Sequence, residues 1–155
     1  MTVTSDAPAD TAMMRIVHNA LRRDLERARG SLAAPERADA TQRRAIGAHL
    51  TWMMSFLRAH HESEDRGLYP LVRARVGDAA DARAVLDRME REHEAIAPAV
   101  AAVETAAVAL VADPGDAVTQ SALDALETLA ASLLPHLREE EDDAMPIAAR
   151  SITAA

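Results

Sequence analysis

Apolar residues recur at alternating steps of three and four along four long stretches of the chain. In the third stretch the series includes Leu86, Met89, Ile96, Val100 and Val103. This spacing gives an α-helix one apolar face, and it is typical of helices packed side by side in a bundle. Gly (5) and Pro (7) are scarce, and Phe, Trp and Tyr occur once each. A β-sandwich or barrel, which needs β-branched and aromatic strands joined by many turns, is therefore excluded.

The four stretches predict four helices, over about residues 11–32, 40–64, 78–111 and 117–142. The second continues through Pro70 to Gly77, and a last turn covers 146–152. The connections at 33–40 and 113–116 are short, which favours antiparallel neighbours. A chain of 155 residues has room for one domain. We therefore predict an all-α, up-down-up-down antiparallel four-helix bundle over residues 11–152, with a short extra C-terminal turn and a disordered tail over residues 1–10.

Composition also narrows the function. The absence of cysteine excludes disulfides, thiolate metal sites and cysteine nucleophiles. The net charge of -8 argues against binding to nucleic acid or to an anionic membrane. No run reaches the roughly 18 consecutive apolar residues of a membrane span, and the first ten residues do not resemble a signal peptide. We expect a cytoplasmic protein with neither a nucleic-acid nor a membrane partner.

Each of the four apolar series contains one histidine, namely His18, His60, His93 or His136. His18 lies 18 residues before residue 36 in the first connection, and His60 lies 24 residues after it. His93 lies 21 residues before residue 114 in the second connection, and His136 lies 22 residues after it. Because antiparallel helices rise about 1.5 Å per residue, the four imidazoles are expected at nearly one level of the bundle.

Two carboxylates accompany these histidines. Glu64 follows His60 by four residues and Glu140 follows His136 by four, so each pair shares a helix face. A proline follows each glutamate by six residues, which makes the pattern His-x3-Glu-x5-Pro occur twice. Buried imidazoles and carboxylates are costly without partners. A pair of metal ions would supply those partners, and nitrogen and oxygen ligands without sulfur suit iron or manganese, with zinc possible.

Several short motifs carry a resemblance to a known family. They are Ile16-Val17-His18 with Leu21-Arg22-Arg23-Asp24-Leu25, His60-His61-Glu62-Ser63-Glu64-Asp65 leading to Leu68-Tyr69-Pro70, Glu92-His93-Glu94-Ala95-Ile96, and His136-Leu137-Arg138-Glu139-Glu140. Together, over residues 12–148, the chain resembles the hemerythrin-like HHE cation-binding proteins. The resemblance implies a non-haem centre of two iron ions, bridged by an oxo or hydroxo group, with manganese or zinc as second choices. By position it implies that His18, His60, His93 and His136 are terminal ligands and that Glu64 and Glu140 bridge.

One position departs from the oxygen-carrying members of that family. They have a second histidine one turn after the third-helix ligand, where this chain has Ala97. His61, Glu90 or a water molecule could fill the place. Glu90 precedes His93 by three residues, whereas His61 points about 100° away from His60 and would need a helix distortion to reach the metals. The departure argues against reversible oxygen carriage and favours an exchangeable, reactive site.

Other residues near the expected centre have structural interpretations beside functional ones. Tyr69 is expected to make an interhelical hydrogen bond, with approach to an iron as the alternative. His49, about 16 Å before His60 along the helix, is expected in the core or in an access channel, with a redox or proton-relay role as the alternative. Trp52 is expected to pack at a helix boundary, and residues 139–143, apart from Glu140, to form a solvated acidic face. Four apolar residues are expected to line the metal pocket: Met14, Phe56, Met89 and Leu133.

The pattern of histidines and glutamates, together with what the resemblance implies, leads us to expect a di-iron protein. It would bind or redox-process a small ligand, which is dioxygen, hydrogen peroxide or nitric oxide. The alternative is a non-catalytic iron or oxygen sensor, or an iron-binding regulatory protein, whose stability depends on metal loading. The residues alone do not decide whether the protein is an enzyme.

Overall fold

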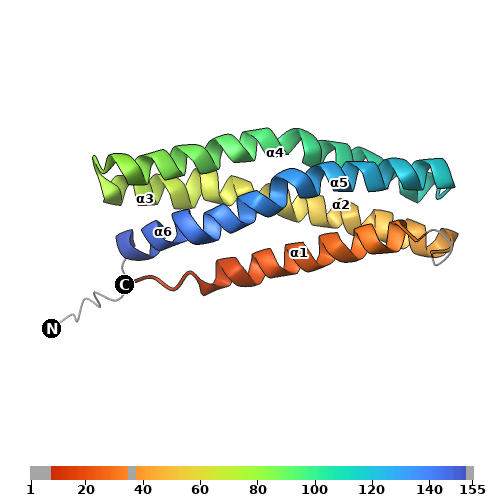
Figure 1. Ribbon diagram of the computed structural model, residues 1–155, viewed down its shortest axis with the longest axis horizontal. Coiled ribbons are helices and arrows are strands. Elements are labelled where there is room, and N and C mark those ends of the chain that lie inside the picture. The colour runs from red at the N-terminus through yellow and green to blue at the C-terminus, as the bar shows by residue number, and fades with distance from the viewer. Residues whose placement is uncertain (1–7, 35–37, 153–155) are drawn as a thin grey trace.

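The structure, a computed structural model, describes residues 8–34 and 38–152 and shows a four-helix bundle. The helices form four rods, which lie side by side along the long axis (Figure 1). Two are single helices, α1 (Ala12–Leu32) and α4 (Ala80–Ala112). The other two are composite, and each contains a short π-helical segment. They consist of α2 (Ala40–Ser63), η1 (Glu64–Leu68) and α3 (Tyr69–Val76), and of α5 (Asp116–Glu139), η2 (Glu140–Ala144) and α6 (Met145–Ser151).

The helices begin and end within a few residues of the predicted positions. Of the predicted tail, residues 1–7 lie outside the described residues, as do 35–37 of the first connection. Residues 8–10 of the predicted tail are described by the structure. The N–H of Ala9 donates to the carbonyl oxygens of Ala149 and Ile152, both at 3.0 Å, which ties this segment to α6. The side chain of Asp10 accepts a hydrogen bond from the N–H of Ala12 and so satisfies one of the free N–H groups at the start of α1.

The apolar series predicted from the sequence form the core. The larger core cluster contains Leu25, Leu57, Ile96 and Leu126, and a smaller one at the other end of the bundle contains Met89, among others. The rod α4 packs along both α2 and α5, and α1 packs mainly against α5. The buried histidines and glutamates lie between the two clusters along the helices, so apolar side chains cover the site from both ends.

Glycine brings α2 and α4 into close approach. A Cβ atom at Gly47 would lie 2.8 Å from the carbonyl oxygen of Ala107 and 2.9 Å from Cγ2 of Val111. At the same end of the bundle, the guanidinium of Arg43 donates to the carbonyl oxygens of Ala38 and Pro114. These contacts fix the position of α2 against the start of α5 and the end of α4.

The composition of helix α4 is relevant to the expectation that the protein has no membrane partner. It contains an 18-residue window with a mean hydropathy of 2.0, so by length and composition alone it could cross a membrane. The core helix of a bundle meets the same description, and α4 turns an apolar face from Leu86 to Leu110 into the core. The expectation of no membrane partner therefore stays a prediction.

Candidate metal centre

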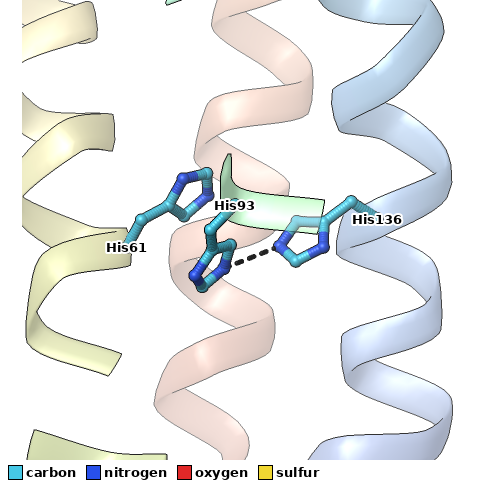
Figure 2. Close-up of side chains that lie close together, drawn as sticks. All are labelled: His61, His93 and His136. Carbon is cyan, nitrogen blue, oxygen red and sulfur yellow. Dashed lines mark hydrogen bonds between the residues drawn. The ribbon is translucent and has the colours of Figure 1, made fainter. Parts of the chain in front are cut away.

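Two groups of histidine and glutamate side chains lie next to each other in the bundle core. One contains His18, His60, Glu64 and Glu140, and the other contains His61, His93 and His136. Within each group the potential ligand atoms all lie within 4.8 Å of one another. In the second group (Figure 2), the three imidazoles converge from α2, α4 and α5, and the Nε2 atoms of His93 and His136 are 3.1 Å apart.

The two glutamates connect the groups. Glu64 has Oε1 3.1 Å from Nε2 of His60 in the first group and Oε2 3.5 Å from Nε2 of His93 in the second. Glu140 has Oε2 3.3 Å from Nε2 of His18 and 3.9 Å from Nε2 of His136. Each carboxylate therefore faces one histidine of each group, which is the placement that a bridge between two cations requires.

Outer carboxylates orient three of the histidines. The Nδ1–H of His18 donates to Glu141 at 2.8 Å, that of His93 to Asp65 at 2.7 Å, and that of His136 to Glu92 at 2.8 Å. With Nδ1 protonated, each ring turns a lone pair on Nε2 toward the interior, as metal-binding histidines do.

Sequence reasoning missed these partners, and it assigned Glu141 wrongly to a solvated face. Each of these carboxylates is the immediate sequence neighbour of a predicted ligand, yet it accepts a hydrogen bond from a histidine on another rod. Asp65 follows Glu64 but binds the α4 histidine, and Glu92 precedes His93 but binds the α5 histidine. The adjacent acids were a usable signal, although only the packing of the rods decides which histidine each one reaches.

Buried polar atoms at the centre have no hydrogen-bond partner among the described residues. They are both carboxylate oxygens of Glu64, Oε2 of Glu140 and Nε2 of His61. Such atoms cost free energy when they are withdrawn from water without compensation. Two cations bound by these atoms would remove that cost, so the donor set fits a pair of metal ions.

Burial also sets the charges of these groups in the metal-free protein. It lowers the pKa of His60 to about 4 and that of His61 to about 2, so both rings are neutral and able to bind a metal at neutral pH. Burial, together with the negative charge of Glu140, raises the pKa of Glu64 to about 10. Burial acts in the same direction on Glu140, but its close contacts with His18 and with the Tyr69 hydroxyl outweigh it and lower its pKa to about 2.

His61 joins the second group without the helix distortion that we expected. The π-helical segment begins only at Glu64, so His61 projects from regular α-helix. Because successive residues point about 100° apart, His60 turns toward α1 while its neighbour turns toward α4 and α5. The ring of His61 stacks on that of His93, with centroids 4.0 Å apart. It lines one cavity of about 240 Å³ together with Ala97, the position of the missing histidine.

The other candidate for that place, Glu90, does not reach either group. Its carboxylate accepts from Arg73 at 2.7 Å and is about one-third exposed. Tyr69 makes the predicted interhelical hydrogen bond, because its buried hydroxyl donates to Oε1 of Glu140. Burial raises the pKa of Tyr69, so the phenol remains a donor.

The repeated His-x3-Glu-x5-Pro pattern marks the two π-helical segments. Each glutamate is the first residue of its segment, and its carbonyl oxygen accepts from the N–H five residues later, that of Tyr69 or Met145. The prolines lie one residue further on, at Pro70 and Pro146. Since proline lacks an N–H and crowds the carbonyl four residues before it, it favours this wider turn. The sequence had suggested only plain continuations of the helices.

The predicted pocket-lining residues take different places. Met14 lines an apolar cavity of about 310 Å³ that reaches His60. Phe56 covers the ring of His60 from the outer side, with centroids 6.3 Å apart. Met89 and Leu133 are buried in the two core clusters on either side of the site.

Two structural interpretations were wrong. The side chain of His49 is 45% exposed and lies 3.4 Å from Asp24, so it belongs to the surface and not to the core. Trp52 lies in the middle of α2 and not at a helix boundary, and it is 60% exposed. The position of His49 was inferred from its seam spacing, which does not resolve a residue at the edge of the apolar face.

Comparison with known families supports the cation-binding interpretation. The family model of the hemerythrin HHE cation binding domain matches residues 9–148, nearly the whole chain. No curated protein and no solved structure gives a significant match.

Proposed function

Because the chain belongs to the hemerythrin HHE cation-binding family, we propose that its two side-chain groups hold two iron ions. In this proposal an oxo or hydroxo group bridges the ions, and the protein binds or redox-processes dioxygen, hydrogen peroxide or nitric oxide. The observation that carries it is the position of Glu64 and Glu140, each facing one histidine of each group. Nitrogen and oxygen donors without sulfur favour iron or manganese.

Different residues would bind each of the two ions at this centre. His18 and His60 would hold one ion, His61, His93 and His136 the other, and the two glutamates would join them. The bound pair would supply one-electron redox steps and open coordination positions for a small ligand. The outer carboxylates would keep the histidine Nε2 lone pairs directed inward.

Two cavities offer routes for a small ligand. The apolar cavity of about 310 Å³ is lined by Met14, Val17, Leu68 and Met145, and it ends on His60. Its side chains would exclude water while they admit an uncharged diatomic molecule or peroxide. The second cavity reaches His61 and His93 beside Ala97. Because the small side chain of Ala97 leaves this cavity beside His61 and His93, we favour an exchangeable, reactive site over a reversible oxygen carrier.

We also infer the up-down-up-down order of the rods from contacts between them. Arg44, near the start of α2, donates to the carbonyl oxygen of Val111 at the end of α4. Arg58, further along α2, pairs with Glu104, which lies earlier in α4. Contacts that advance along one helix and retreat along the other indicate antiparallel neighbours. This order would bring the four seam histidines to one level.

The experiment uses the full chain loaded with ferrous iron without oxygen, then exposed separately to dioxygen, hydrogen peroxide and nitric oxide. We expect new visible absorption and consumption of at least one of these ligands. The Glu64→Ala variant should lose both, since one bridge is gone. If iron raises thermal stability but no ligand reacts, the protein is a sensor or regulator and the redox proposal is wrong. If the chain binds no iron, both functions are wrong.

A further inference from the structure

An aromatic row leads from the surface of α2 to the metal centre. It consists of His49, Trp52, Phe56 and His60, spaced at three, four and four residues. The ring centroids are 5.8, 5.7 and 6.3 Å apart along the row, and the interplanar angles are 25°, 18° and 5°. The rings are therefore stacked in series, and the last one belongs to the proposed ligand His60.

Burial does not explain this row. Trp52 is 60% exposed and Phe56 is 38% exposed, so both forgo much of the stabilisation that an aromatic ring gains in a core. The chain has only three Phe, Trp or Tyr residues, and the third, Tyr69, donates to Glu140. All three thus connect to the same centre, directly or through one another. Spaced pairs on a helix surface would stabilise α2 only slightly.

We propose that the aromatic row carries single electrons between the protein surface and the metal centre, with Trp52 as the outer redox residue. This inference rests on the proposed redox function. The indole of Trp52 is the most easily oxidised group of the row. Phe56 is not itself oxidised, but its ring fills the gap between Trp52 and His60 and provides electronic coupling across it.

The electrons and protons of this step balance. The indole of Trp52 gives one electron through Phe56 and His60 to the oxidised centre, and its N–H proton passes to water. A soluble one-electron reductant, for which ascorbate is the probe, then returns one electron and one proton and restores the indole. His60 is also where this route meets the apolar cavity.

The test runs the route in reverse, in the full chain loaded with ferrous iron. A freely diffusing ruthenium photo-oxidant, with a cobalt(III) complex as electron acceptor, removes one electron from Trp52, the sole tryptophan. Transient absorption then follows the lifetime of the indole radical. We expect the indole radical to have a shorter lifetime with iron than without it, because the ferrous centre donates an electron to the radical. Phe56→Leu should lose this iron-dependent decay, and Phe56→Tyr should keep it, at equal iron content.

A matched control tests whether the row matters or only the distance. Ala101 is exposed on α4 and follows His93 by eight residues, as Trp52 precedes His60 by eight. The double variant Trp52→Phe with Ala101→Trp therefore offers an exposed indole off the row, and its radical should show no iron-dependent decay. If this radical decays as in the wild type, or if Phe56→Leu has no effect, the inference is overturned while the di-iron proposal stands. If no iron binds, the proposed function itself fails.

Discussion

At the scale of single residues, His61 and Ala97 illustrate how one position compensates for another. A histidine is missing on α4, and its neighbour on α2 supplies an imidazole to the same cavity. The sequence predicted the four seam histidines because their spacing follows the helix period. It offered His61 as one of three ways to fill the missing place but expected a helix distortion, because the prediction assumed a single site facing one direction. The two groups lie on different sides of α2, so adjacent residues reach both.

The first prediction concerns this compensation. His61→Ala should speed iron release to a chelator by at least about tenfold, the lower end of what loss of a metal site's supporting group costs. Ala97→His alone should change the rate little, because His61 already serves that place. Adding Ala97→His to His61→Ala should restore slow release, since the exposed position 97 has room for an imidazole. A double variant that releases iron as fast as His61→Ala would contradict this account.

The second prediction concerns the outer carboxylates. Glu141→Gln should weaken iron binding by about 10–100-fold, because the amide holds the His18 ring and its tautomer less firmly. Competition with a chelator of known affinity measures the change. Asp142→Asn is the matched control, since it removes the next charge of the same acidic run at an exposed position. Equal affinities in the two variants would mean that Glu141 acts only through overall charge.

The third prediction concerns the metal-free protein between pH 7 and pH 10. Burial raises the pKa of Glu64 to about 10, so the folded protein holds a proton there that the unfolded chain has already lost. Stability is therefore lost as the pH rises, at about 1.4 kcal/mol per unit at most. Denaturant titrations at several pH values should show this decline in the wild type. The decline should be absent in Glu64→Gln, and its persistence there would assign it to another group.

At the scale of elements, the helices and their faces were predictable and the π-helical segments were not. The alternating steps in α4, from Leu86 to Leu110, directly give the buried face that the structure shows. The segment beginning at Glu64 depends on one hydrogen bond that shifts from the fourth to the fifth residue, a difference too small for apolar spacing to reveal. The repeated proline was its only trace in the sequence.

The fourth prediction compares two glycines inside helices. Gly47→Ala should destabilise the protein by about 1–3 kcal/mol, because the new methyl group meets the backbone of α4 at Ala107. Gly30→Ala should instead stabilise it by about 0.5–1 kcal/mol, since nothing lies within 4 Å and alanine favours the helix. Unfolding free energies measured in denaturant test both. Similar values for the two variants would contradict the close approach of α2 and α4.

At the scale of the whole molecule, the centre is part of the core and not an addition to its surface. All four rods contribute to it, and apolar clusters close it at both ends. Buried oxygens of Glu64 and Glu140 have no hydrogen-bond partner among the described residues, and bound cations would supply one. Metal loading should therefore link the function of this protein to its stability. Outer partners such as Glu92 depend on how the rods pack, which is why only the whole fold reveals them.

The most direct test of this account is the metal content of the full chain after anaerobic loading with iron and removal of excess metal. We predict two irons per chain in the wild type. Glu64→Gln and Glu140→Gln should each lower this number, while Asp142→Asn should keep it at two. Stoichiometric binding of a single iron in the wild type, or binding of two that neither glutamate variant affects, would contradict a centre bridged by Glu64 and Glu140.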